Sequence, residues 1–371
     1  MYLYILLFSI SVCFKEDKFP KDHALEHFDD FYANVYGERK WKSMRLALLC
    51  PKKYCAVVNN YSDADKIMNK LEVCVILGLL RDQKSSCAVC ERSLRFCACN
   101  QAYGLEDYVP ESKHYGYYET ESEFPIYITE DEFDVLVSFL FADYFLLDGA
   151  SLFPVLALNL QPNDRILDLC AAPGGKSLIM LQTLFPRFLT CNDVSEPRLK
   201  RLKIILKDYF TDIDDKVAVT KINGSQYQEE PNFYNKILVD VPCTTDRLSV
   251  KDNDDNIFAP ARIQERLELP EAQAALLVNA LKLVTVGGTV VYSTCTLSPI
   301  QNDGVVHLAL KKIWEETELQ FVIKDMSKVL EVARPLFPLE TKLDLKYGHL
   351  VCPYLPANFG PMYFCKLVRV K

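Results

Sequence analysis

The chain has no excess of basic residues. It carries 42 Lys and Arg against 50 Asp and Glu, for a net charge of −8 and a pI near 5.3. This balance excludes a protein that attracts nucleic acid over its whole surface, so a polynucleotide ligand would need a local basic patch or a basic partner. Gly and Pro are also modest in number, at 13 and 19 of 371 residues. Disorder is therefore expected only locally, and half of the residues are apolar, which is ample for one large domain with a smaller one attached.

Long apolar runs are missing apart from one at the N-terminus. Residues 1–14 (MYLYILLFSISVCF) are apolar, but the run is too short to span a bilayer comfortably. It has neither the basic flank nor the small-residue cleavage site of a signal peptide, and it is not Arg-rich like a transit peptide. Residues 1–21 are therefore interpreted either as a degenerate targeting segment or as a mis-assigned start. Nothing else suggests a membrane partner.

A dense disulfide scaffold is absent as well. The 14 cysteines are spread along the chain, which favours a reducing compartment. Four of them lie close together in a polar, Cys- and Tyr-rich insertion (82–125), as Cys87-x-x-Cys90 and Cys97-x-Cys99. Four thiolates can bind zinc tetrahedrally, but the loop between the pairs is short for a zinc ribbon. A loosely ordered insertion with free thiols is the favoured interpretation, and a zinc site is the alternative.

The chain divides into two regions by pattern. Apolar residues at helical spacing predict helix over 22–49, and a second helix is expected over 63–80. We therefore expect an N-terminal helical region over 22–138 and a second, larger domain over 139–371. From Phe139 onward, strands and helices alternate, which is typical of an α/β fold. Strands are expected at 165–169, 188–191, 216–220, 236–240, 289–293, 348–352 and 362–370, and helices at 196–210, 261–284 and 305–314.

The first of these strands runs into a glycine turn. Residues 166–176 (ILDLCAAPGGK) combine a strand, small residues and two glycines, and a helix follows. Such a turn allows close approach of a ligand to free backbone N–H groups, although it is not the dinucleotide G-x-G-x-x-G pattern. Asp193 ends the next strand, where a carboxylate can accept both ribose hydroxyls of an adenosine-type ligand. The competing interpretation of Asp193 is a helix cap at Ser195.

Two further strands end in cysteines. Cys243 follows Val239-Asp240-Val241-Pro242, and Cys295 follows Tyr292-Ser293-Thr294. Side chains at the carboxyl ends of parallel strands face a shared ligand crevice, so both thiols are expected there. Thiolate is a strong nucleophile, and two thiols in one crevice indicate covalent chemistry with divided roles. Cys170 and Cys191, in contrast, are expected to be core residues.

Three motifs carry a family resemblance. CAAPGGK (170–176), DVPC (240–243) and STCTLSPIQN (293–302) occur in the order and spacing of the Sun/nucleolar-protein family of RNA cytosine-5 methyltransferases. DVPCTTDR (240–247), NIF (256–258), ANFGPMYFCK (357–366) and YCAVVNN (54–60) resemble the branch that acts on mitochondrial ribosomal RNA. The resemblance implies a class I S-adenosylmethionine-dependent methyltransferase fold, α/β and Rossmann-like, with a mostly parallel seven-stranded sheet and an N-terminal helical extension. It also implies that residues 139–371 form the catalytic domain and that the N-terminal helical region over 22–138 binds RNA.

The resemblance also implies which residues bind S-adenosyl-L-methionine. Gly174, Gly175 and Lys176 match the positions at its methionine end, Asp193 matches the ribose position, and Arg198 matches a further cofactor position. Asn223 and Gly224 fall where the family has Asp-Gly beside the adenine, so a weakened or rearranged contact is expected there. Asp240 is implied to lie beside both the cofactor and the target base.

The family's chemistry assigns the two cysteines different steps. Carbon 5 of cytosine becomes nucleophilic only after a thiolate adds to carbon 6, and the resemblance gives that role to Cys295. Cys243 is implied to act in release of the product, and Asp240 is implied to activate N3 of the ring. The target base must leave its stack to be reached.

RNA contacts and partners are less defined by sequence. Basic residues cluster at 198–207, at 39–45, and at Arg262 and Arg266, where phosphate contact and a solvated surface are both open. The resemblance implies a mitochondrial matrix enzyme acting on small-subunit ribosomal RNA in mitochondrial ribosome assembly. It also implies a partner, a helical-repeat protein of the mitochondrial transcription-termination-factor family, and targeting to the mitochondrial large ribosomal subunit. The alternatives are a mitochondrial or cytosolic tRNA methyltransferase and a ribosome-assembly binding factor whose methylation is incidental.

Overall fold

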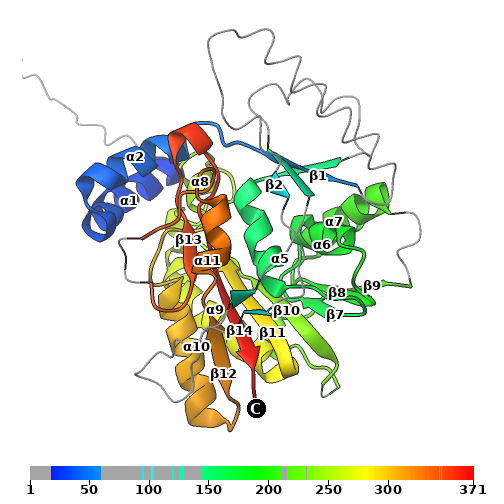
Figure 1. The fold of residues 1–371 in the computed structure, drawn as a ribbon. Coiled ribbons are helices and arrows are strands. Elements are labelled where there is room, and N and C mark those ends of the chain that lie inside the picture. Colours follow the sequence, from blue (N-terminus) through cyan, green and yellow to red (C-terminus); the bar gives the residue numbers. More distant parts are fainter. Residues whose placement is uncertain are drawn as a thin grey trace, which may run out of the picture.

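A computed structural model describes residues 18–59, 144–210, 215–230, 232–341, 343 and 345–371, with the backbone of four short strands between 94 and 128 (Figure 1). The predicted helix at 63–80 and residues 1–14 lie outside the described residues, as does the predicted insertion (82–125) apart from short strand backbone. No helix in the described part of the chain combines the length and apolar character needed to cross a membrane.

The N-terminal region begins with two helices, α1 (Pro20–Tyr36) and α2 (Glu38–Leu49). Pro20 suits the first turn of α1, where its missing N–H is not needed, and the Asp22 carboxylate accepts from the Phe19 N–H at 3.1 Å. One helical stretch was expected over 22–49. The structure breaks it at Gly37, whose φ of +80° is readily adopted only by glycine and turns the chain between the two helices.

A small sheet links this region to the rest of the chain. Its strand order is β2-β5-β1-β6, and β1 (Cys55–Val58) runs antiparallel to β6 (Tyr144–Leu147). Residues on both sides of the predicted boundary at 138/139 therefore share one sheet. The remaining strands of this part are β2 (Leu94–Arg95), β3 (Ala102–Tyr103), β4 (Glu119–Thr120) and β5 (Pro125–Ile128).

The central sheet has the strand order β12-β14-β11-β10-β7-β8-β9, with β13 as an eighth strand paired to β14. The pairs from β11 to β9 are parallel, whereas β14 runs antiparallel to both β11 and β12. Its strands are β7 (Arg165–Asp168), β8 (Phe188–Asn192), β9 (Val217–Thr220), β10 (Tyr234–Asp240), β11 (Val284–Thr294), β12 (Phe321–Lys324), β13 (His349–Val351) and β14 (Met362–Arg369). This is the predicted mostly parallel α/β sheet. The sequence did not reveal β12.

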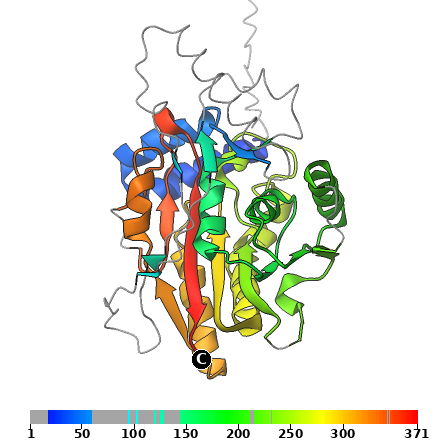
Figure 2. The same ribbon diagram turned by 45° about the vertical axis from the view of Figure 1, so that its right-hand side comes forward.

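Helices cover both faces of this sheet (Figures 1 and 2). One hydrophobic cluster packs α9 and α10, together with α1, against the sheet, and the other packs α5, α6 and α7. The helices and short turns of this part are η1 (Gly149–Ser151), α5 (Leu152–Leu158), α6 (Gly175–Gln182), α7 (Glu196–Tyr209), η2 (Gly224–Gln226), α8 (Asp246–Ser249), η3 (Pro260–Arg262), α9 (Ile263–Leu283), α10 (Asp303–Glu316), α11 (Ser327–Leu330), η4 (Glu331–Ala333) and η5 (Leu355–Ala357).

The topology brings the motif residues to one edge. β7, β8, β10 and β11 are parallel neighbours, so their carboxyl ends lie on the same side of the sheet. The register pairs Asp240 with Ser293 across β10 and β11, and Leu238 with Asp168 across β10 and β7. The loops that follow these strands therefore start beside one another.

Candidate active site

The two motif cysteines meet at this edge. The Sγ atoms of Cys243, after β10, and Cys295, after β11, lie 3.2 Å apart. Cys243 is buried, whereas Cys295 is partly exposed. The hydrogen bond with Cys295, together with burial, raises the pKa of the Cys243 thiol well above its usual range. Cys243 therefore holds a proton beside the sulfur of Cys295, and the more accessible sulfur belongs to Cys295.

A backbone group also points at this pair. The Thr245 N–H donates to the Cys243 sulfur at 3.4 Å. Thr245 has a φ of +44°, a left-handed conformation that is costly for a β-branched residue. The packing around the loop must therefore hold this residue in place, and the N–H contact partly opposes the rise in the Cys243 pKa.

Asp240 lies between a lysine and a serine. Its Oδ2 accepts from Lys176 Nζ at 2.7 Å, and its Oδ1 accepts from Ser293 Oγ at 2.7 Å. Burial disfavours the charge on Lys176, but the ion pair with Asp240 more than compensates and raises the lysine pKa. The raised pKa keeps Lys176 protonated, so this lysine can supply a proton through Asp240 to a bound ring.

The glycine turn forms a ligand cradle at the start of α6. Gly174 has a φ of +112°, and a Cβ there would come within 3.1 Å of the Leu202 side chain. Gly175 opens α6, and no side chain in the described part of the chain caps the helix, so backbone N–H groups at this end are available to a ligand. An anionic group is the ligand that such a helix start favours.

A buried carboxylate at the end of β7 was missed by sequence reasoning. Asp168 is 1% exposed; its Oδ2 accepts from Ser177 Oγ at 2.6 Å, and its Oδ1 has no hydrogen-bond partner among the described residues. Burial raises the Asp168 pKa to about 7. An unpaired buried carboxylate oxygen is costly and suits a cationic ligand group. The only signal in the sequence was an acidic residue inside an otherwise apolar strand.

Asp193 and Arg198 lie across the glycine turn from this carboxylate. Asp193 is buried; its Oδ2 accepts from the Ala172 N–H at 3.2 Å and lies 3.5 Å from Arg198 Nη1. Its Oδ1 accepts from the N–H of Ser195, the N-cap residue of α7, at 2.9 Å; this bond forms a local turn before the helix and does not cap the N–H groups of α7. That contact leaves lone pairs on both oxygens, and the ribose role stays a prediction.

Asn223 and Gly224 form a tight turn after β9. The Asn223 side-chain oxygen accepts from the Ser225 N–H at 3.1 Å and caps η2. A Cβ on Gly224 would meet the Leu276 side chain at 2.7 Å and that of Leu169, which follows β7, at 3.1 Å. The turn therefore packs against the same strand end as the glycine cradle. The Asn223 side-chain amide is already hydrogen-bonded within the turn.

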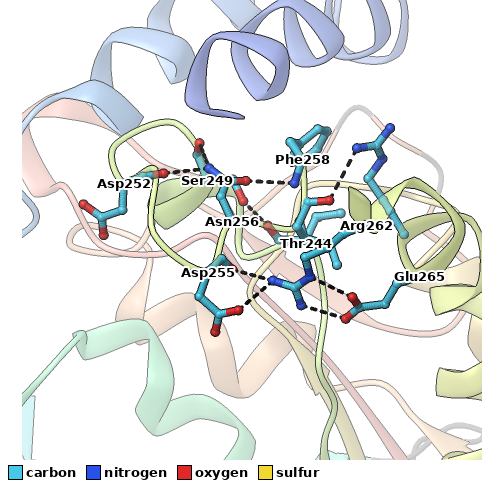
Figure 3. Close-up of polar contacts among 10 residues, drawn as sticks. Thr244, Ser249, Asp252, Asp255, Asn256, Phe258, Arg262 and Glu265 are labelled. Atoms are coloured by element: carbon cyan, nitrogen blue, oxygen red, sulfur yellow. Dashed lines mark hydrogen bonds and ion pairs between the residues drawn. The ribbon is translucent and has the colours of Figure 1, made fainter. Parts of the chain in front are cut away.

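Two predicted basic clusters are largely neutralised. Arg262 lies in η3 before α9, not on the helix, and its ion pairs with Asp255 and Glu265 measure 2.9 Å and 2.7 Å. Figure 3 shows Arg262 between these two carboxylates. Arg266 stacks over the Phe258 ring, 4.5 Å from its centroid. In the N-terminal cluster, Lys40, Lys42 and Arg45 pair with Glu340, Glu38 and Asp29. The exposed basic side chains of α7 (Lys200, Arg201, Lys203 and Lys207) remain candidates for phosphate contact.

The predicted zinc ligands Cys87, Cys90, Cys97 and Cys99 lie outside the described residues. Within the described ranges, no group of three or more His, Cys, Asp or Glu side chains is arranged to hold a metal ion. Cys191 is fully buried in the core, as expected, and Cys170 is partly exposed beside the glycine turn.

Comparison with known proteins agrees with this geometry. The family described as 16S rRNA methyltransferase RsmB/F matches residues 155–347. The 5-cytosine rRNA methyltransferase NSUN4 of Bos taurus is 37% identical over 96% of this chain and 91% of its own length. The mitochondrial tRNA (cytosine(34)-C(5))-methyltransferase of Mus musculus is also 37% identical, but over only 61% of this chain and 64% of its own.

The fold is shared with solved structures. The crystal structure of NSun6 from Pyrococcus horikoshii with SFG superposes with a TM-score of 0.61 at 18% identity, covering 93% of this chain and 98% of that one. The family match, which spans half of the chain, and the near full-length relatives lead to one conclusion. The chain belongs to the RsmB/F, or Sun, family of S-adenosylmethionine-dependent RNA cytosine-5 methyltransferases.

Proposed function

We propose that this enzyme methylates carbon 5 of a cytosine in mitochondrial small-subunit ribosomal RNA through a covalent cysteine–cytosine intermediate. The observation that carries the covalent mechanism is the 3.2 Å separation of Cys243 and Cys295, two thiols of unequal exposure at the end of neighbouring parallel strands. A pair of this kind suits one sulfur that attacks and one that handles a proton.

The residues of the cradle fit S-adenosylmethionine. Asp168, whose Oδ1 lacks a partner, would accept from the cofactor's ammonium group, and the free N–H groups at the start of α6 would receive its carboxylate. Asp193 would bind the ribose hydroxyls with Arg198 beside it, and Asn223-Gly224 would border the adenine. When bound, the cofactor supplies an electrophilic methyl group on a sulfonium sulfur.

Cys295 and Cys243 divide the work on the base. The Cys295 thiolate adds to carbon 6 of the cytosine, and the carbon–sulfur bond makes carbon 5 nucleophilic enough to accept the methyl group. Release then requires that carbon 5 lose its proton while the carbon–sulfur bond breaks. We assign this step to Cys243. Its thiol must first give its proton to solvent, and the resulting thiolate, whose raised pKa makes it a strong base, then takes the proton from carbon 5 as the Cys295 sulfur leaves carbon 6.

Asp240 and Lys176 supply a proton to the ring nitrogen N3. Addition of sulfur to carbon 6 places negative charge on the ring near N3, and a proton delivered there lowers the barrier. The Lys176–Asp240 pair holds such a proton within one 2.7 Å hydrogen bond. We propose that Asp240 relays it to N3, with Ser293 fixing the carboxylate's second oxygen.

The choice between ribosomal RNA and transfer RNA rests on how much of this chain each kind of relative matches. The rRNA methyltransferase of Bos taurus aligns with 96% of this chain, whereas the mitochondrial tRNA methyltransferase aligns with 61%, so ribosomal RNA is favoured over transfer RNA. Four further parts of the proposal rest on the motif resemblance alone. They are placement in the mitochondrial matrix, a role in mitochondrial ribosome assembly, a partner of the transcription-termination-factor family, and targeting to the large ribosomal subunit.

Bisulfite sequencing of total RNA tests this proposal. Cells lacking the protein should lose 5-methylcytosine at a position in mitochondrial small-subunit ribosomal RNA, and the wild-type chain should restore it while Cys295→Ala should not. Loss at a tRNA position instead would establish the tRNA alternative. If Cys295→Ala restores ribosome assembly without methylation, the protein acts mainly as a binding factor in assembly.

A further inference from the structure

One buried carboxylate joins both cysteine loops. Asp246 is fully buried; its Oδ1 accepts from Thr244 Oγ1 at 2.7 Å, and its Oδ2 accepts from the Leu297 N–H at 2.8 Å. Thr244 directly follows Cys243, and Leu297 lies two residues after Cys295. A single side chain therefore ties the loop that carries one sulfur to the loop that carries the other.

A further donor to this carboxylate comes from the N-terminal helix α1. The Tyr32 hydroxyl donates to Asp246 Oδ2 at 2.7 Å, although the two residues are 214 positions apart in sequence. The Tyr32 ring is itself fixed, since it is 1% exposed and packs against Phe28 and Trp41 with ring centroids 5.0 and 5.2 Å apart. The hydroxyl therefore has little freedom to leave the carboxylate.

Two more contacts tighten the same junction. Thr244 and Thr296 share a hydrogen bond of 2.8 Å between their hydroxyls, which links the two loops directly. Tyr36, one turn further along α1, donates to the Leu297 carbonyl at 2.6 Å. Helix α1 thus touches the Cys295 loop at the Leu297 carbonyl and at the Thr296 hydroxyl, which lies 3.3 Å from the Tyr32 hydroxyl, and it also reaches this loop through the shared Asp246 carboxylate.

We propose that Tyr32 is a positioning residue for methyl transfer: by donating to Asp246, it sets the separation of the Cys243 and Cys295 sulfur atoms. Reaction at carbon 6 requires the attacking sulfur to be placed within a fraction of an ångström, and a small misplacement lowers the rate without weakening substrate binding. This inference rests on the proposed covalent mechanism. It makes α1 part of the catalytic scaffold as well as a part of the region proposed to bind RNA.

Tyr32→Phe is the direct test, and Tyr234→Phe is its matched control. Tyr234 also carries a buried hydroxyl, bonded to Thr190 Oγ1 at 2.8 Å, but it begins β10, the strand whose other end is Asp240. The full chain is assayed with S-adenosylmethionine and a small-subunit ribosomal RNA transcript. kcat, KM for RNA and the melting temperature are measured for each variant.

Tyr32→Phe should lower kcat about tenfold or more while KM for RNA changes less than about twofold. Tyr234→Phe should lower the melting temperature to a similar extent and leave kcat within about twofold of wild type. Formation of a denaturation-resistant adduct on RNA carrying 5-fluorocytosine, which has no proton to lose at carbon 5, should slow in Tyr32→Phe alone. If Tyr32→Phe does not fold, Tyr36→Phe takes its place, with the same direction of effect expected.

The outcomes separate the two proposals. If wild-type protein methylates RNA but Tyr32→Phe and Tyr234→Phe have equal kcat values, Tyr32 is only structural and this inference is wrong. If wild-type protein forms no adduct with 5-fluorocytosine RNA while methylating unmodified RNA, the covalent mechanism itself fails, whatever Tyr32 does.

Discussion

The sulfur atoms of Cys243 and Cys295 lie 3.2 Å apart although the two residues are 52 positions apart in the chain. Each follows a strand of the central sheet, and those two strands are parallel neighbours in register from Lys236 and Thr289 to Asp240 and Ser293. The sheet therefore supplies the coarse placement of both thiols. Their different burial then gives them different chemistry.

Replacing Cys295 should abolish the reaction. Without the thiolate at carbon 6, carbon 5 cannot attack the methyl donor, so Cys295→Ala should lower methyl transfer by at least about three orders of magnitude and form no adduct. Radiolabelled methyl transfer and denaturing gels measure both quantities. Cys191→Ala, which removes a thiol buried in the core, is the control and should retain the wild-type rate. An active Cys295→Ala enzyme would contradict the assignment.

Replacing Cys243 should trap the enzyme on its substrate. If this thiol removes the proton at carbon 5, Cys243→Ala still forms the carbon–sulfur bond but releases RNA slowly, and kcat should fall about 10²- to 10⁴-fold. A denaturation-resistant protein–RNA complex should accumulate under turnover conditions. The double variant with Cys295→Ala should show no such complex. Absence of the complex in Cys243→Ala alone would remove Cys243 from the release step.

Asp168→Asn should change both the pH dependence of stability and the affinity for the cofactor, and the two effects can be measured separately. Burial raises the Asp168 pKa to about 7, so the native state keeps its proton at pH values where the unfolded chain, with a pKa near 4, has lost it. Stability from this group is therefore present at low pH and is lost as the pH rises through about 7. The amide stays neutral, so the melting temperature of the variant relative to wild type should increase between pH 5 and 8.

The same variant should bind S-adenosylmethionine about tenfold or more weakly, because an amide replaces the carboxylate offered to the ammonium group. Calorimetry on the purified protein measures this affinity. Asp164→Asn is the control: Asp164 is also a buried acid with a raised pKa, but it lies at the opposite end of β7 and bonds the Asn235 side chain. Equal loss of affinity in both variants would mean that Asp168 does not contact the cofactor.

The sequence predicted the sheet well because each parallel strand is a short apolar run ending in a polar motif. Strand β12 escaped prediction because its apolar run ends in a lysine and no glycine turn or cysteine motif follows it, whereas the equally short β7 leads into the glycine turn. Strand β11 starts earlier than expected, at Val284, because Gly287 and Gly288 masked its first half. The two cysteines were predicted to lie close together because each follows the carboxyl end of a parallel strand, and these ends share one edge of the sheet.

What sequence could not predict are contacts made by tertiary packing. Asp246 and Arg247 drew attention only as part of a family motif, and Tyr32 only as one apolar position in a helix. The bonds that join them to distant segments depend on how α1 and α2 dock onto the sheet, and no local pattern encodes a pairing across 200 residues. The missing partner of Asp168 Oδ1 likewise follows from the packing around it.

Arg247→Met should weaken the attachment of the N-terminal helices α1 and α2 to the rest of the fold. Arg247 is 8% exposed and donates to the Ala47 carbonyl at the end of α2, the Gly360 carbonyl and the Asn358 side chain, at 2.9, 2.9 and 2.8 Å. Its loss leaves several buried acceptors without a donor, which should lower the free energy of unfolding by about 3 kcal/mol or more. Chemical denaturation, followed by tryptophan fluorescence from Trp41 in α2, measures the change.

Arg262→Met provides the comparison, because Arg262 belongs to the same part of the chain but its ion pairs with Asp255 and Glu265 are open to solvent (Figure 3). Exposed pairs of this kind contribute about 0–1 kcal/mol, and salt should reduce the difference further. Arg247→Met should also become sensitive to proteolysis between α2 and β1, since Asn358 holds that segment through the Pro51 carbonyl and the Lys53 N–H. If the two variants lose equal stability, Arg247 does not anchor α2, and the N-terminal helices must be held by their apolar contacts alone.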